Sequence, residues 1–124
     1  MSTRCHTIVT KGNKKAYLYR HYDGYPSSAG QDLKNFIRDD FDEIDGMSVN
    51  DFAVELHNYE EFFEFENDSV HGDEDYIYFV NLSDRTIKTY MVKEGSHATE
   101  NPEDLDFKEE VKFDDLKETS AAFS

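Results

Sequence analysis

Asp75-Tyr-Ile-Tyr-Phe-Val-Asn-Leu82 is the strongest strand signal in the chain, because aromatic and β-branched residues fill it. Ser83-Asp84-Arg85 follows as a turn, and Thr86–Lys93 alternates apolar and polar residues as a returning strand. The sequence therefore predicts an antiparallel hairpin over residues 75–93.

A second hairpin is predicted near the start of the chain. Residues 3–10 are rich in β-branched side chains, Lys11-Gly12-Asn13-Lys14 is typical of a turn, and residues 15–21 form the partner strand. The side chains of that strand alternate between two faces: Tyr17, Tyr19 and His21 share one, and Ala16, Leu18 and Arg20 share the other.

Two helices are predicted between the hairpins. Apolar residues at helical spacing indicate the first helix over residues 29–44, capped by Ser27 or Ser28; they are Leu33, Phe36, Ile37, Phe41 and Ile44. A similar stripe predicts a second helix that is capped by Ser48 or Asn50, ends near Phe63 and leads into an extended segment.

These elements predict an α+β fold, in which an antiparallel sheet built from two hairpins carries two helices on one face. The last apolar residues, between Phe107 and Leu116, fit either a strand or a short helix. With 124 residues the chain has room for one domain, expected over residues 1–118, and we expect a frayed tail over 119–124.

Composition limits the class of protein. Cys5 is the single cysteine, so no disulfide forms within the chain, and neither a signal peptide nor an apolar run of about 20 residues is visible. We therefore expect a cytoplasmic protein without membrane association.

Charge is distributed unevenly. Residues 1–38 carry seven Lys/Arg and two Asp/Glu, whereas residues 39–75 carry fifteen Asp/Glu and no Lys/Arg, and the whole chain has a net charge of −15. The acidic stretch repels phosphates, which argues against direct binding of nucleic acid.

One motif stands out at the end of the first hairpin. The strand ends in His21-Tyr22-Asp23-Gly24-Tyr25-Pro26, and Gly30 follows before the first helix. Together with Thr3-Arg4 near the start, this pattern resembles a family of short uncharacterised phage and prophage proteins. The resemblance covers about the first third of the chain. It implies a mobile-element origin, inside a host cell's cytoplasm, and no particular activity.

The motif allows two interpretations. In the first, Asp23 and Gly24 form a turn, Arg20 pairs with Asp23, and Pro26 stiffens the entry to the helix. In the second, the loop binds a small molecule or nucleotide, because backbone N–H groups at a helix start attract anions and His21 or Asp23 can serve as a base for hydrolysis. The ligand-binding residues are then Arg4, Arg20, His21, Asp23, Tyr25 and Ser27.

The acidic stretch also allows two interpretations. It is either a solvated surface that keeps a small protein soluble, or a mimic of a nucleic-acid duplex that occupies the basic groove of a host protein. The candidate partner-binding residues are Asp39, Asp40, Asp42, Glu43, Asp51, Glu55, Glu60, Glu61 and Glu64.

The sequence contains no recognisable motif for a metal site, a phosphate-binding loop or a serine hydrolase. Neither acidic run ending in glycine matches a calcium loop, the five histidines form no short-spaced pair, and no phosphate loop or serine elbow is present. The sequence predicts no metal, no cofactor and no catalytic residues.

The leading hypothesis is therefore a non-enzymatic phage accessory protein that binds a basic host protein, for instance one involved in defence. A nucleotide-binding protein is the alternative. A structural phage part held together by exposed Phe62, Phe63 and Phe65 is a third.

Overall fold

A computed structural model describes residues 3–66 and 70–116. Its centre is a six-stranded open sheet with the strand order β3-β2-β1-β4-β5-β6. The strands are β1 (Cys5–Lys11), β2 (Lys14–Arg20), β3 (Glu64–Glu66), β4 (Tyr76–Asn81), β5 (Thr86–Val92) and β6 (Leu105–Lys112). The C-terminal tail expected at 119–124 lies outside the described residues.

The α+β class predicted from the sequence is confirmed, and the sheet is mostly antiparallel. β1 pairs with β2, and β4 pairs with β5, in antiparallel register. The expectation of a purely antiparallel sheet is wrong, because β1 and β4 pair in parallel, with Cys5 opposite Tyr76. Between β2 and β4 the chain passes through the helical layer and then through β3, and β4 runs in the direction of β1.

Two further strands extend the sheet at its edges. β3 adds to β2. β6 adds to β5, with a register shift between Thr89 and Tyr90, and a helical turn at 113–116 follows it. The apolar residues near the C-terminus, which fitted either a strand or a short helix, thus form both.

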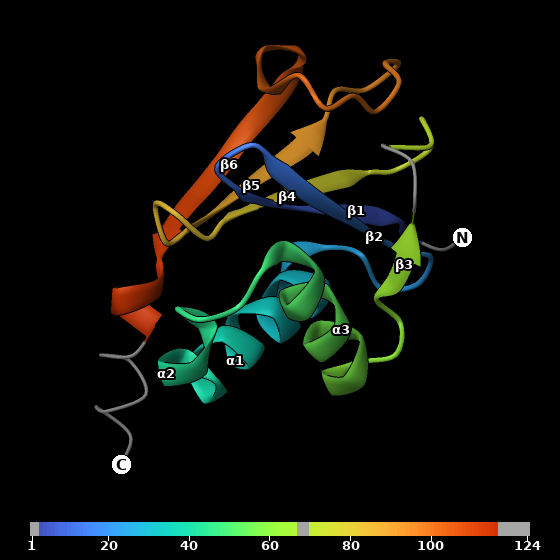
Figure 1. Cartoon of the computed structure of the whole chain (residues 1–124). Coiled ribbons are helices and arrows are strands. Elements are labelled where there is room, and N and C mark those ends of the chain that lie inside the picture. Colours follow the sequence, from blue (N-terminus) through green and yellow to red (C-terminus); the bar gives the residue numbers. More distant parts are fainter. Residues whose placement is uncertain (1–2, 67–69, 117–124) are drawn as a thin grey trace.

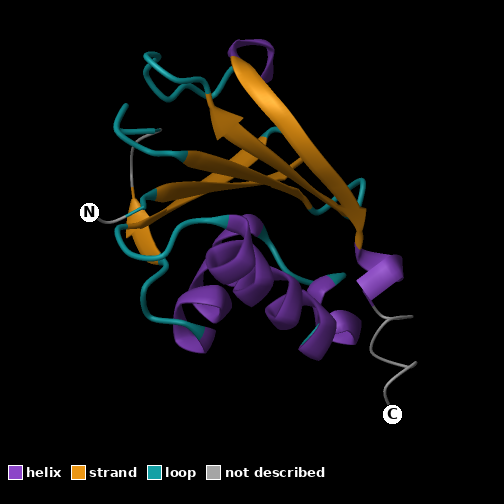
Figure 2. Ribbon diagram, turned by 180° about the vertical axis from the view of Figure 1, so that it is seen from behind, coloured by secondary structure: helices purple, strands orange, loops and turns teal. Residues whose placement is uncertain are grey.

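The helices are η1, a π-helical turn (Pro26–Gly30), α1 (Gln31–Asp39), α2 (Phe41–Ile44), α3 (Val49–Tyr59) and η2, a 3₁₀ turn (Pro102–Asp104). Figures 1 and 2 show α1, α2 and α3 in one layer beneath one face of the sheet. The helix expected at 29–44 is interrupted at Asp40, whose φ of −107° and ψ of 23° are not helical. The helix expected to end near Phe63 already ends at Tyr59.

Ser48, one of the two N-cap residues predicted from the sequence, is the N-cap of helix α3. The Ser48 side chain accepts a hydrogen bond from the Asp51 backbone N–H, and the Asp51 carboxylate accepts one from the Ser48 N–H. This reciprocal pair satisfies two backbone donors that the helix itself leaves open.

The main core lies between the helices and the sheet. Phe36 and Phe52 meet edge to face, with ring centroids 5.1 Å apart, against Leu18 and Val80 of the sheet. A smaller cluster around Ile8, Ile77 and Tyr90 occupies the opposite face.

Loops cover part of that opposite face. The Ala98 N–H donates to the Gly72 carbonyl at 3.2 Å and so links residues 93–104 to the loop before β4. Within the described part of the chain, no helix combines the length and the apolar character that a membrane crossing requires.

Candidate functional site

The Asp-Gly-Tyr-Pro loop is fastened to the start of β1. The Gly24 N–H donates to the Thr3 carbonyl at 2.8 Å, and the buried Tyr78 hydroxyl donates to the Gly24 carbonyl at 2.8 Å. A Cβ atom on Gly24 would lie 2.7 Å from the carbonyl carbon of Arg4, closer than real Cβ atoms approach backbone. Asp23 before it has a positive φ of 53°. The glycine is thus explained by packing alone.

Arg20 lies on the helix-facing side of the sheet. Its guanidinium is almost fully buried, donates to the Asp32 carboxylate at 2.9 Å and to the Ser28 hydroxyl at 3.3 Å, and lies 4.9 Å from the Phe63 ring centroid. The ion pair expected between Arg20 and Asp23 is therefore replaced by one with Asp32. Arg20 ties the loop, α1 and the segment after α3 together.

The helix start after Pro26 offers few free donors. The Ser28 N–H donates to the Tyr25 carbonyl, and the Ala29 N–H donates to the Asp23 carbonyl. These two N–H groups at the helix start are thus used within the loop and do not face an anion. Ser27 is exposed, and the Tyr25 hydroxyl donates to the Asp23 carboxylate.

Arg4 and His21 meet on the other face of the sheet. The Arg4 Nε donates to His21 Nδ1 at 3.2 Å, and the Tyr19 hydroxyl lies 3.2 Å from the same nitrogen. Arg4 also pairs with Asp73 at 3.1 Å. The structure therefore joins Arg4 with His21 and places Arg20 on the opposite face.

A buried His–Glu pair lies beside this contact. The side chains of His6 and Glu74 have no exposed surface, and His6 Nδ1 lies 2.9 Å from Glu74 Oε2. The other ring nitrogen of His6, Nε2, has no hydrogen-bond partner within the described residues. A buried polar group in this situation is costly unless something compensates it.

Glu74 is held in its charged form. Burial raises its pKa, but the contact with His6 and hydrogen bonds from the backbone N–H groups of His71 and Gly72 lower it by more, so the pKa falls to about 2. The carboxylate thus shapes the loop that precedes β4.

His71 lies above the pair. Its ring stacks on Tyr19 with centroids 4.2 Å apart and planes 25° apart, and its Nε2 lies 3.2 Å from Glu66 Oε2. One ligating atom each from His71, Asp73 and Glu74 lie within 4.8 Å of one another.

Sequence reasoning missed this cluster of His6, His71, Asp73 and Glu74. Sixty-eight positions separate His6 from Glu74, and only the parallel register of β1 and β4 brings them together. The nearest available signal was His71-Gly72-Asp73-Glu74, in which a histidine lies close to two acids.

The predicted partner-binding acids lie on the helical layer and the segment after it. We call these nine residues the acidic surface: Asp39, Asp40, Asp42, Glu43, Asp51, Glu55, Glu60, Glu61 and Glu64. Each is exposed or half-buried. The Tyr59 hydroxyl, at the end of α3, donates to Asp39 Oδ2 at 3.3 Å, which joins the acids of α1 to those after α3.

Exposed rings lie among the later acids. Tyr59, Phe62 and Phe65 are 43%, 42% and 50% exposed, and Tyr22 packs on Phe62 with centroids 5.9 Å apart. We call Tyr22, Tyr59, Phe62 and Phe65 the aromatic rim. Phe63, which the third hypothesis counted among the exposed rings, is fully buried.

Comparison with known proteins adds no relative: no family model, no curated protein and no solved structure matches this chain significantly.

Proposed function

We propose that the protein is an accessory protein of a phage or prophage that binds a basic host protein through its acidic surface. The partner is a nucleic-acid-binding or defence protein, whose cationic groove the acidic surface occupies in place of a duplex. No catalytic step is part of the proposal.

The observation that carries the proposal is that the acids of this surface are almost free of cations. Among the described residues, Asp39 is the one member in an ion pair, with its neighbour Arg38 at 3.3 Å. No Lys or Arg occurs between Asp39 and Asp75, and Arg85, which lies against α2, pairs with Asp45 outside the acidic surface. The carboxylates of the surface therefore repel one another and project a negative field. A basic partner would relieve this repulsion.

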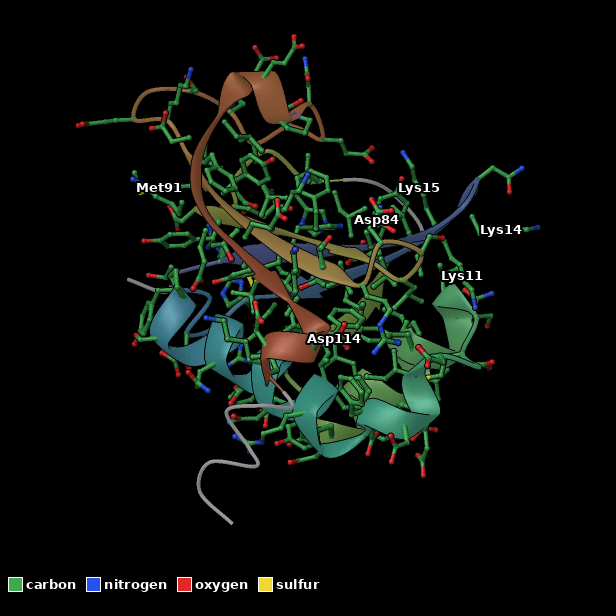
Figure 3. All side chains as sticks on the ribbon, turned by 90° about the vertical axis from the view of Figure 1, so that its left-hand side faces the viewer. Lys11, Lys14, Lys15, Asp84, Met91 and Asp114 are labelled. Carbon is green, nitrogen blue, oxygen red and sulfur yellow. The ribbon has the colours of Figure 1, made fainter. Side chains whose placement is uncertain are left out.

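Among the described residues, the lysines of the first hairpin form no ion pair with the acidic surface. Lys11, Lys14 and Lys15 lie at its tip in Figure 3. Lys11 Nζ donates to the Met47 carbonyl at 2.9 Å, and Lys15 Nζ lies 3.6 Å from Glu100. Lys11 thus reaches the helical layer between α2 and α3, where it contacts a carbonyl group and not a carboxylate of the acidic surface.

The aromatic rim supplies the second property of a protein-binding surface. Aromatic side chains bury much area at little cost in conformational entropy, and they dominate the binding energy of many interfaces. Phe62 directly follows Glu60 and Glu61, so one docked partner can contact a ring and carboxylates together. Glu64 and Phe65 point to opposite faces of β3, because Glu64 pairs with Tyr19 and Phe65 pairs with Leu18.

Competition with a duplex tests the proposal. A fluorescent duplex is bound to each member of a panel of basic nucleases and DNA-binding proteins, and its release by the protein is measured by anisotropy at about 50 and 200 mM salt. The test variant carries Asp42→Asn, Glu43→Gln, Glu55→Gln, Glu61→Gln and Glu64→Gln. The matched control carries Glu94→Gln and Glu103→Gln, which neutralise exposed acids outside the acidic surface.

We expect the wild type and the control to release the duplex from at least one panel member, less efficiently at the higher salt. The test variant should need at least about tenfold more protein. Release that is equally efficient with the test variant, or no release from any panel member, would contradict the proposal.

A further inference from the structure

We propose that His71, Asp73 and Glu74 form a binding site for one divalent transition-metal ion, with Zn²⁺ as the best match. The site lies on the sheet face opposite the helices and is independent of the acidic surface.

The three ligands come from one short loop that the fold holds in place. Their ligating atoms lie within 4.8 Å of one another. Bonds of about 2.0–2.2 Å to a common ion require ligand atoms about 3–4 Å apart. His71 and Asp73 are exposed, so small changes of their side-chain torsions close this difference.

His71 is already oriented as metal-binding histidines are. Its Nε2 faces the Glu66 carboxylate at 3.2 Å, which leaves Nδ1 to face an ion. Histidine ligands commonly donate their other N–H to a carboxylate, which fixes the ring and makes the ligating nitrogen more basic. The stack on Tyr19 restrains the ring further.

His6 contributes a second observation, a buried ring nitrogen without a hydrogen-bond partner among the described residues. It is fully buried, its Nδ1 lies 2.9 Å from the Glu74 carboxylate, and its Nε2 has no hydrogen-bond partner within the described residues. Glu74 is already held by His6 and by the backbone N–H groups of His71 and Gly72, so His6 would support the ligating carboxylate when an ion binds. His6 is thus a positioning residue in the site.

Arg4 is expected to lower the affinity of the site for a metal ion, because it pairs with one of the ligands. Its guanidinium pairs with Asp73 at 3.1 Å, and an ion must compete with that pair. Removal of the guanidinium, in an Arg4→Gln variant, should therefore strengthen metal binding, whereas a purely structural loop would gain nothing from it.

The donor set selects the class of metal. An imidazole nitrogen with two carboxylates suits Zn²⁺ and its neighbours in the first transition row, whereas Ca²⁺ and Mg²⁺ prefer oxygen ligands alone. Excess Mg²⁺ should therefore leave Zn²⁺ bound.

Calorimetric titration of the chelator-treated full chain with Zn²⁺, in about 5 mM Mg²⁺, tests the site. The variants are His71→Ala and Asp73→Asn, and the matched controls are His97→Ala and Glu94→Gln, which alter an exposed histidine and an exposed acid elsewhere. Melting temperatures without metal show whether each variant is folded.

We expect one ion per chain, an affinity at least about tenfold weaker in either site variant, tighter binding in Arg4→Gln, and no change in the controls. Absence of Zn²⁺ binding would overturn the proposal. So would equal affinity in His71→Ala and wild type, because it would show adventitious binding to surface acids. Neither result bears on the duplex competition, since the variants leave the acidic surface intact.

Discussion

Replacement of Glu74 by Gln should remove a large electrostatic contribution to stability. The side chain keeps its shape in Glu74→Gln but loses the charge that His6 and two backbone N–H groups stabilise. The pKa of Glu74 falls from 4.5 to about 2 on folding. At about 1.36 kcal/mol per pH unit this corresponds to about 3 kcal/mol at neutral pH.

The sign of the pH dependence follows from the lowered pKa. Above pH 4.5 the carboxylate is ionised in both the folded and the unfolded chain, and its full contribution is present. Between pH 4.5 and about 2 the unfolded chain takes up the proton first, so the contribution is lost as the pH falls. The Glu74→Gln variant has no carboxylate at this position, so its free energy of unfolding should not show this part of the decrease at low pH.

Urea unfolding at pH 7, 5 and 3 measures both effects. We expect Glu74→Gln to lower the free energy of unfolding by about 2–3 kcal/mol at pH 7 and to differ less from wild type at pH 3. Glu94→Gln, an exposed acid, is the control and should change stability by less than about 0.5 kcal/mol. A loss below about 0.5 kcal/mol in Glu74→Gln, or an unchanged difference at pH 3, would refute the electrostatic account.

Three further predictions concern the loop and the core. Gly24→Ala should lower the free energy of unfolding by at least about 2 kcal/mol in urea titrations, because its Cβ meets backbone at 2.7–2.9 Å; a neutral effect would show that the loop moves freely. Tyr78→Phe removes the buried hydrogen bond to the Gly24 carbonyl and should cost about 1–2 kcal/mol in the same titrations, so wild-type stability would contradict the anchoring role. Burial raises the pKa of the Cys5 thiol to about 12, and the thiol should therefore react with a disulfide reagent at neutral pH only after denaturant is added; fast labelling of the native chain would contradict this burial.

Local patterns in the sequence predicted most elements of the fold, since alternation and helical spacing depend on neighbouring residues. The parallel pairing of β1 with β4 was not predictable in this way, because the residue pattern of a strand does not show which other strand it pairs with. The interruption at Asp40 was missed for a related reason: Phe41 and Ile44 keep the helical spacing across the break.

The candidate sites show the same limit. Strand alternation already put Arg20 and His21 on opposite faces, which is where the structure places them, and this argues against a single pocket that uses both. His6, by contrast, is an isolated histidine in the sequence, and its contact with Glu74 appears only once β1 and β4 are paired.

Carboxyl footprinting of the protein bound to a panel member tests the central proposal most directly. Free carboxylates are coupled to an amine by a carbodiimide, and mass spectrometry gives the labelling of each residue with and without the partner. Binding through the acidic surface predicts that Asp42, Glu43, Glu55, Glu61 and Glu64 lose reactivity in the complex, while Glu94 and Glu103 keep theirs. Unchanged labelling of the first group, or protection confined to the second, would contradict it.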